Sequence, residues 1–204
     1  MPDAFHSTRA FVLETPNLLL ELLKEADAGG IYQLYSDWKV AQELRRIVYP
    51  FSQADASAMI TRAQQSFAQT SGYILGIFLK EHAAFVGVNA LFIPANDEAL
   101  SAEERAEDAG LGILGYSILP DHWGKGYATE SSVRMIRFAF DELGLTTLQA
   151  SIRQGHGASR RVIERLGFRV VEAGIEEEPT YGGPAHIVDR YWLRREQWNS
   201  APTE

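Results

Sequence analysis

Cysteine is absent from this 204-residue chain, and its absence excludes three kinds of site. The chain can form no disulfide framework, offer no thiolate to a metal ion and use no cysteine as a nucleophile. Long hydrophobic runs are absent too. No apolar stretch approaches the roughly 20 residues of a membrane-spanning helix, and the opening residues MPDAFHSTRAFVLETP hold no signal-peptide core. We therefore expect a cytoplasmic protein that makes no contact with a membrane.

The chain has fewer basic residues than acidic ones. The chain has 19 Lys and Arg residues against 27 Asp and Glu residues, which gives a formal net charge of −8. This balance argues against sequence-independent binding of nucleic acid, which requires a basic surface. An acidic surface suits a cationic substrate such as an amine, but solubility is the simpler explanation. The composition is otherwise that of a globular protein, and the length fits one domain over residues 1–204.

The hydrophobic periodicity predicts an alternation of strands and helices. Strands are expected at residues 18–23, 73–80, 84–93, 111–119, 146–153, 168–174 and 186–195. Helices are expected at residues 24–37, 51–69, 127–144 and 158–167, with Ser52 capping the second and Gly144 ending the third. The acidic segment 94–110 is expected to be an exposed loop or a short solvated helix.

The connections between these elements predict a mixed α/β sheet. The short polar link Glu81–His82 joins two strands as an antiparallel hairpin. The later strand–helix–strand run over 111–153 predicts a right-handed crossover between parallel strands. Ligands of open α/β sheets bind beyond the carboxyl ends of such strands. The stretch DHWGKGYATE lies at that position, so a binding site is expected there.

Two glycines in that stretch, Gly124 and Gly126, allow two interpretations. A tight turn alone can require them. Alternatively, they let an anion approach the backbone N–H groups of residues 123–128 at the start of a helix, with a hydroxyl from Thr129 and a charge from Lys125. The dinucleotide fingerprint and the phosphate-binding loop of nucleotide hydrolases both fail to match this spacing. Taken alone, the motif leaves the two interpretations equally open.

A longer segment resembles a known family. LGYSILPDHWGKGYATESSVRMIRFAFDELGLTTLQASIRQGHGASRRVIERLGFRVV is similar to the core of the GCN5-related N-acetyltransferases (GNAT), in the RimJ/RimL-like branch of ribosomal-protein N-acetyltransferases. ETPNLLLELLKEADAGGIYQLYSD, YPFSQADASAMI and DRYWLRREQW resemble other parts of that branch, so the resemblance covers nearly the whole chain. WGKGYATE and SRRVIERLGF are its most specific parts.

The resemblance implies a fold and a cofactor site. The fold would be a mixed, mostly antiparallel sheet, splayed between its two central parallel strands and flanked by helices, with acetyl-CoA in the opening. Cofactor-binding positions carried over from the family, on the strand edge, the loop and the following helices, are Ser117, Ile118, Leu119, Trp123, Gly124, Lys125, Gly126, Tyr127, Ala128, Thr129 and Ser159. No metal is implied.

The chain departs from the family pattern at several places. Asp121 stands where the family usually has Gln or Arg, and an acidic group there should point away from a pyrophosphate. Ile113 replaces a Glu that is frequent in this branch, and Ile163 replaces a Tyr used by relatives outside it. His156 stands in place of an Asn, whereas the Ser of that motif is retained as Ser159. A carboxylate base and a tyrosine acid are therefore missing from those positions.

Acyl transfer to an amine needs a base for the ammonium and a donor for the leaving thiolate. By the resemblance, Ser159 is expected near the sulfur, although capping of its helix explains it equally well. His156 is a candidate base, since histidine can accept a proton near neutral pH; a surface loop residue is the plainer interpretation. Tyr116 is a weaker catalytic candidate, and Glu43 and Tyr73 are weaker candidates for the acceptor side.

These observations predict an N-acetyltransferase that moves the acetyl group of acetyl-CoA directly to a primary amine, on a protein N-terminus or a small molecule. The alternative is a CoA-binding module without activity, which the missing residues at 113 and 163 keep open. An oxidoreductase is disfavoured because the dinucleotide fingerprint fails. The acceptor groove is expected between the first two helices, the Glu81–His82 hairpin and residues 176–186, in a monomer or homodimer.

Overall fold

A computed structural model describes residues 11–96, 109–178 and 184–199 of the chain. Its strands form one sheet in the order β1-β2-β3-β4-β5-β6-β8-β7. The strands are β1 (Val12–Glu14), β2 (Leu18–Leu22), β3 (Gly72–Leu79), β4 (Phe85–Phe92), β5 (Leu111–Ile118), β6 (Thr147–Arg153), β7 (Arg169–Glu177) and β8 (His186–Arg194). The helices are α1 (Ala28–Ser36), α2 (Trp38–Ala41), α3 (Gln53–Ala68), α5 (Tyr127–Arg137), α6 (Gly157–Arg165) and α7 (Arg195–Asn199).

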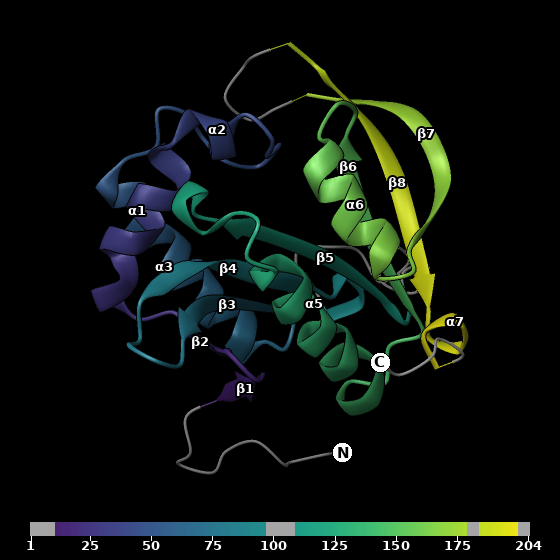
Figure 1. Ribbon diagram of the computed structural model, residues 1–204, viewed down its shortest axis with the longest axis horizontal. Helices are drawn as coiled ribbons and strands as arrows, with labels where there is room; N and C mark the ends of the chain where they lie inside the picture. Colours follow the sequence, from purple (N-terminus) through teal and green to yellow (C-terminus); the bar gives the residue numbers. More distant parts are fainter. Residues whose placement is uncertain (1–10, 97–108, 179–183, 200–204) are drawn as a thin grey trace.

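Helices cover both faces of this sheet (Figure 1). One hydrophobic cluster joins α1, α2 and α3 to one face, through strand residues such as Ile74 and Val88. A second cluster joins α5 and α6 to the opposite face, through Leu75 and Ile77. Ile74 and Leu75 are consecutive, so their side chains point to opposite faces of the strand. Because both faces of β3 are covered, its residues 72–79 read as a nearly unbroken apolar run.

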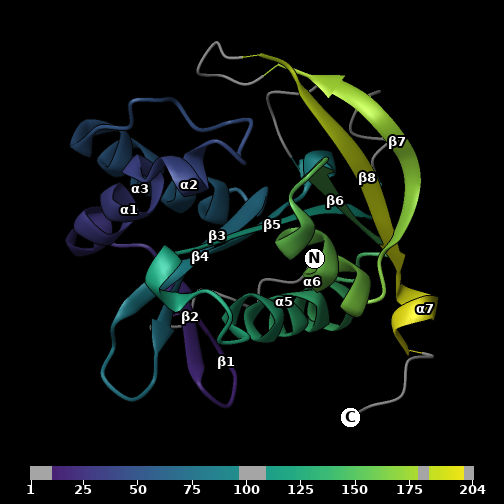
Figure 2. The same ribbon diagram turned by 45° about the horizontal axis from the view of Figure 1, so that its top comes forward.

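The centre of the sheet contains its one parallel pair among the described strands. β5 and β6 pair only over Leu111↔Thr147, Gly112↔Leu148 and Ile113↔Gln149. Beyond Ile113 the two strands diverge, and the divergence is visible between the β2–β5 half and the β6–β8 half of the molecule (Figure 2). The mixed sheet and its splay between the two parallel strands match the predicted fold class.

Most predicted elements are present, with shifted ends. The helix expected at 24–37 begins as a 3-10 turn over Glu25–Asp27 before α1. The helix expected at 127–144 ends its α-helical part at Arg137 and continues as a π-helical turn, η4 (Phe138–Glu142). Three short elements, β1, α2 and α7, were not predicted. Most of the acidic segment 94–110 lies outside the described residues; its start forms a 3-10 turn, η2 (Pro94–Asn96).

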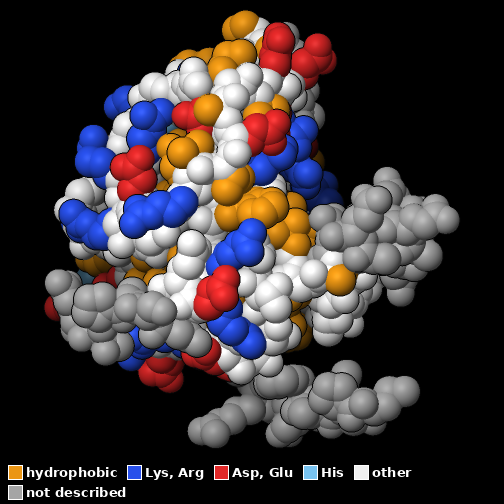
Figure 3. Space-filling model, turned by 90° about the vertical axis from the view of Figure 1, so that its right-hand side faces the viewer, with side chains coloured by type: hydrophobic (Ala, Val, Ile, Leu, Met, Phe, Trp, Pro, Cys, Tyr) orange, Lys and Arg blue, Asp and Glu red, His pale blue; other side chains and the backbone are white. Residues whose placement is uncertain are grey.

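The outer edge of the C-terminal half is β7. Its pairing with β8 is interrupted by register shifts between Val170 and Glu172 and between Glu172 and Ile175. On this side of the molecule, acidic, basic and hydrophobic side chains are intermingled (Figure 3). Glu172 forms an ion pair with Arg190 of β8 at 2.5 Å. Irregular pairing and charged side chains are features that keep an exposed edge strand from pairing with other chains.

No helix among the described residues has the length and apolarity to cross a membrane.

Glu130, in the first turn of α5, ties that helix to the β1–β2 turn. Its carboxylate accepts hydrogen bonds from the Thr15 hydroxyl at 2.6 Å, the Asn17 backbone N–H at 2.8 Å and the Asn17 side-chain amide at 3.1 Å. Burial alone would raise the pKa of Glu130, but the hydrogen bonds from Thr15 and Asn17 outweigh it and lower the pKa below its usual value. The start of α5 is therefore fixed by the ionised carboxylate.

We predict that Glu130→Gln lowers the free energy of unfolding at pH 7 by about 1–2 kcal/mol, since a charge-assisted hydrogen-bond set is weakened. A folded-state pKa below the unfolded value of about 4.3 gives stability that is present above that pH. This stability is lost as the pH falls through the folded pKa, so the difference between the two proteins should shrink in acid. Urea unfolding from pH 7 to pH 3 measures it. Glu81→Gln is the control, because the Glu81 side chain is 91% exposed. A gap of constant size at all pH values would contradict the prediction.

Candidate active site

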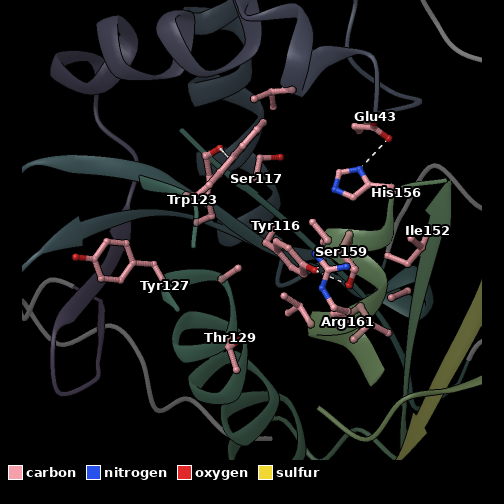
Figure 4. A pocket seen from close by; sticks show the side chains of 18 of the residues that line it. Glu43, Tyr116, Ser117, Trp123, Tyr127, Thr129, Ile152, His156, Ser159 and Arg161 are labelled. Carbon is pink, nitrogen blue, oxygen red and sulfur yellow. Dashed lines mark hydrogen bonds and ion pairs between the residues drawn. The ribbon is translucent and has the colours of Figure 1, made fainter. Parts of the chain in front are cut away.

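A cavity of about 490 Å³ lies in the opening between β5 and β6, bounded by α2, α5 and α6. The side chains around it come from both halves of the sheet (Figure 4). Nine of the eleven predicted cofactor-binding residues line it, namely Ser117, Ile118, Trp123, Gly124, Gly126, Tyr127, Ala128, Thr129 and Ser159. The other two do not: Leu119 is buried in the core under α1–α3, and Lys125 is exposed on the loop. The catalytic candidates Tyr116 and His156 also line the cavity.

The glycine loop takes a conformation that only glycine adopts readily. Gly124 has φ +75° and Gly126 has φ +85°, both in the left-handed region. A Cβ at either position would meet no atom within 4 Å. The backbone geometry of the turn is thus sufficient to require glycine at both positions, and the open space around them leaves the loop accessible.

The same loop presents a row of free backbone donors. Within the described part of the chain, the N–H groups of residues 124–129 make no hydrogen bond, and the first N–H of α5 with a partner is that of Glu130, bonded to the Gly126 carbonyl. The N–H of Trp123, also predicted to face the ligand, is instead bonded to the Pro120 carbonyl at 3.1 Å. Six consecutive donors at the start of α5, where the helix dipole is positive, form a site suited to an anion.

The edge of β5 that faces the opening is partly covered by a tryptophan. Leu119 donates its N–H to Val86 of β4 at 2.9 Å, so Leu119 and Ser117 direct their backbone groups toward β4. Tyr116 and Ile118 therefore direct theirs toward the opening. The indole Nε1 of Trp123 donates to the Ile118 carbonyl at 2.7 Å, although half of the Trp123 side chain is exposed. Trp123 thus lies over the free edge rather than beneath the loop.

Two hydroxyl groups meet across the opening. The Tyr116 hydroxyl of β5 lies 2.9 Å from the Ser159 Oγ of α6, and either oxygen can be the donor. Burial raises the pKa of Tyr116 to about 12, a rise that the hydrogen bond with Ser159 partly offsets. The phenol therefore keeps its proton at neutral pH. Ser159 is the third residue of α6 and its side chain faces the cavity. The capping role considered for it is wrong, because His156 is the N-cap residue and no side chain caps this helix.

A charged cluster lies at the start of α6, beside the cavity. Glu43, in the segment between α2 and α3, accepts from Arg153 Nε at 2.7 Å and lies 2.8 Å from Nδ1 of His156. Burial would raise the pKa of Glu43, but the hydrogen bonds from Arg153 and His156 outweigh it, and the pKa falls below its usual value. The cluster joins residues about 110 positions apart in the sequence. Arg153 was not predicted, although it ends β6, where ligands of α/β sheets gather.

Asp189 of β8 holds the segment that carries His156 and Ser159. This buried carboxylate accepts from the Gln154 side chain at 2.8 Å and from the Gly174 N–H at 3.1 Å, and it lies 3.4 Å from Arg160. The hydrogen bond from Gln154 is the largest influence on Asp189 and lowers its pKa. No sequence motif pointed to Asp189, because its partners come from three separate elements.

The remaining candidates lie elsewhere. Tyr73 is buried in an aromatic cluster with Phe67 and Phe138 and does not line the cavity. The Glu81–His82 hairpin does not line the cavity, and part of the expected acceptor segment 176–186, residues 179–183, lies outside the described residues.

His122 lines the cavity, and burial lowers its pKa. Cavity-lining residues that sequence reasoning missed include Lys39, Val40, Leu44, Arg153, Arg161 and Arg165. Nowhere in the described ranges do three His, Asp or Glu side chains gather as a metal site.

Sequence and structure comparisons show which known proteins this chain resembles. A family model described as acetyltransferase (GNAT) domain matches residues 17–169. The uncharacterized N-acetyltransferase YoaA of Bacillus subtilis (strain 168) is 25% identical over 158 residues, 78% of this chain and 82% of the relative. RimL, a ribosomal L7/L12 alpha-N-protein acetyltransferase solved with coenzyme A, has a TM-score of 0.73 at 17% identity, over 90% of this chain and 98% of its own. The ribosomal-protein-S5-alanine acetyltransferase of Vibrio fischeri has a TM-score of 0.73 at 15% identity, over 94% and 100%. The structural matches show a shared fold.

We predict that the two hydroxyls across the opening are energetically coupled. Tyr116→Phe and Ser159→Ala should each lower the free energy of unfolding by about 1 kcal/mol, and the double variant should lose clearly less than the sum, because one hydrogen bond is removed in all three. Urea unfolding of the four proteins measures the coupling. Tyr116→Phe combined with Thr61→Ala, a change on α3, should be additive. An additive Tyr116 and Ser159 pair would show that the hydroxyls do not meet in solution.

Proposed function

The chain belongs to the GNAT family of acetyltransferases and is an acetyl-CoA-dependent acyltransferase, and from this premise we propose that it acetylates a primary amine by direct transfer. The observation that carries the proposal is the row of six free N–H groups, residues 124–129, at the start of α5 beside the opening between β5 and β6. A pyrophosphate needs several converging donors and a positive potential, and this helix start offers both.

The residues of the cavity fit CoA in other respects. The edge of β5 leaves the backbone groups of Tyr116 available to an extended amide-containing chain, such as pantetheine. The indole of Trp123 adds a large apolar surface beside that edge. Arg161 and Arg165 of α6 line the cavity and supply positive charge for further phosphate groups. In this proposal the loop supplies the donors and α6 supplies the countercharge.

Tyr116 and Ser159 are proposed to stabilise the leaving sulfur by hydrogen bonding. A thiol ionises near pKa ~8.5, whereas the pKa of Tyr116 is raised to about 12 by burial. Full proton transfer from this phenol to a thiolate is therefore unfavourable, whereas a hydrogen bond to the thiolate is favourable. The Tyr116 and Ser159 hydroxyls already lie 2.9 Å apart, so the pair can present a donor to the sulfur without rearrangement of the backbone. The proposed role of the pair is therefore donation of a hydrogen bond to the sulfur, and not donation of a proton.

The acceptor is proposed to be the α-amine of a protein N-terminus. Two structural relatives are described as acting on ribosomal proteins, and one of them as an alpha-N-protein acetyltransferase. Lys39 and Val40 of α2 and Leu44 just after it also line the cavity, and the proposal places the acceptor beside them, apart from the glycine loop. Ribosomal proteins are made in the cytoplasm, the location that this proposal implies.

The proposal is tested by release of CoA from acetyl-CoA in the presence of peptides and small primary amines. Because the chain has no cysteine, a thiol reagent reports the product without a background from the enzyme. Stimulation by peptides with free N-termini, and not by the same peptides blocked at the N-terminus, is the expected result. Binding of acetyl-CoA with no turnover on any amine would instead identify a CoA-binding module without activity.

We predict that Gly126→Ala weakens acetyl-CoA binding by about tenfold or more, because a side chain in the loop displaces the donors of the anion site. Replacement also strains the backbone at φ +85°, by about 1–2 kcal/mol. Gly144→Ala is the matched control, since Gly144 has φ +76°, open space around its Cβ and a position after η4, away from the cavity. Calorimetric titration gives the affinities, and thermal unfolding gives the stabilities. Equal losses of affinity in both variants would show that Gly126 is required only for the conformation of the turn and not for an anion site.

A further inference from the structure

We propose that His156 is the general base of this transfer and that Glu43 positions it, through the contact between Nδ1 of His156 and the Glu43 carboxylate. This inference rests on the proposed function, because a base is needed only if an amine is acetylated. The sequence offered His156 and Glu43 as separate candidates, more than 100 positions apart. The structure joins them: the His156 side chain lies 2.8 Å from Glu43, and both line the cavity.

The contact fixes which nitrogen of the ring carries the proton. An ionised carboxylate only accepts hydrogen bonds, so Nδ1 of His156 must be the donor to Glu43. In a neutral ring this leaves Nε2 with a free lone pair. Figure 4 shows the second ring nitrogen turned away from Glu43, toward the side of the cavity where Tyr116 and Ser117 lie. Within the described residues, Nε2 makes no hydrogen bond. The free lone pair therefore faces the space in which the reaction would occur.

Glu43 is itself held in place. Arg153 donates from Nε and from its terminal nitrogen to the two oxygens of the carboxylate. Such a two-point contact fixes the plane of a carboxylate as well as its position. The side chain of Glu43 is only 16% exposed and that of His156 is 28% exposed, so the contact is sheltered from competing water. Glu43 thus orients the base, His156, as the carboxylate does in a catalytic triad, and the acceptor amine is the nucleophile.

The proposed step conserves atoms and charge. The acceptor enters as R–NH3+, and Nε2 of His156 takes one of its protons, leaving the lone pair of R–NH2. That lone pair attacks the thioester carbonyl carbon, the C–S bond breaks, and the sulfur leaves as a thiolate with the electron pair. The nitrogen gives up a second proton, which reaches the sulfur, so that an amide and the CoA thiol are formed. The imidazolium returns its proton to solvent, since the ring is partly exposed.

Other ionisable groups face this cluster from the neighbouring elements. Tyr116 of β5 keeps its proton, because burial raises its pKa to about 12. His186 of β8 lies within the electrostatic range of Arg153, Glu43 and Glu177, and burial is the largest of the influences that lower its pKa. Lys39 of α2 and Arg160 and Arg161 of α6 carry positive charge nearby. His122 lines the same cavity, and burial lowers its pKa too, so the experiment must separate both His186 and His122 from His156.

The test is the pH dependence of kcat/KM for CoA release, with a peptide acceptor that supports turnover by the unaltered protein. His156→Gln should lower kcat/KM by about 100-fold or more and remove the acid limb of the profile, while His186 and His122 are still present. Added imidazole should restore part of the activity of His156→Ala. His82→Gln is the matched control, because His82 lies in an exposed hairpin with its side chain 58% exposed, and its profile should be that of the unaltered protein.

The role of Glu43 is tested by kcat and KM measured separately. Glu43→Gln should lower kcat, by less than His156→Gln does, and leave the KM for acetyl-CoA unchanged, because the ring keeps its lone pair but loses the carboxylate that orients it. Glu43→Asp should keep part of the effect. Acetyl-CoA affinity and thermal stability of each variant show whether the site remains folded. Glu142→Gln, at an exposed ion pair with Arg134, is the control for removal of a surface carboxylate.

The outcomes distinguish the two proposals. If the unaltered protein releases no CoA with any amine, the proposed function fails. If it turns over and His156→Gln keeps both its rate and its acid limb, the base proposal alone is overturned. If His156→Gln behaves as expected but Glu43→Gln keeps the kcat of the unaltered protein, the positioning role of Glu43 is overturned.

Discussion

The brevity of the pairing between β5 and β6 is the constraint on which the site depends. Three residue pairs join the strands, from Leu111 to Ile113, and the remaining five residues of β5 have no β6 partner. A strand that loses its neighbour exposes unpaired backbone groups, which a folded protein normally avoids. Here the same divergence creates the cavity and leaves one edge of β5 to be completed by a ligand. The sheet is therefore interrupted at the position where the acetyl donor would bind.

Side chains bridge the opening that the backbone leaves. The Tyr116 hydroxyl reaches Ser159, and Glu43 reaches Arg153 and His156. A further ion pair, between Arg45 and Glu177 at 2.9 Å, lies at the far end of β7. All these contacts are polar, and each joins the half made by β1–β5 with the half made by β6–β8. Polar bridges can exchange partners with a ligand at low cost, whereas a packed apolar interface cannot. The groups that the proposed chemistry uses therefore also bridge the opening, in addition to the buried apolar cluster that joins the two halves.

The sequence predicts the strands and long helices well because their hydrophobic periods are strong. It places nine of eleven expected cofactor residues at the cavity, since a loop and the strand before it are local features. It misses β1 and α2, which are too short for a period to show. It also misses the environment of Glu43: whether that carboxylate meets His156 depends on how the segment after α2 packs against β6. Contacts between residues about 110 positions apart are set by tertiary packing and leave no local pattern.

The chain lacks a Glu at position 113 and a Tyr at position 163, and these absences were the reason to consider a module without activity. The structure shows what surrounds the residues that stand there. Ile113 pairs with Gln149 in the short parallel region and does not line the cavity, so in this chain position 113 is not where a base would act. Ile163 of α6 is 1% exposed and lines the cavity with an apolar side chain, so this position offers no proton to the reaction. The His156 and Glu43 pair lies beside the cavity, at the start of α6. A base can therefore be supplied from the start of α6, with its orienting carboxylate contributed by the other half of the molecule. On this argument, the departures of the chain from the family pattern are compatible with a transferase whose base has a different origin.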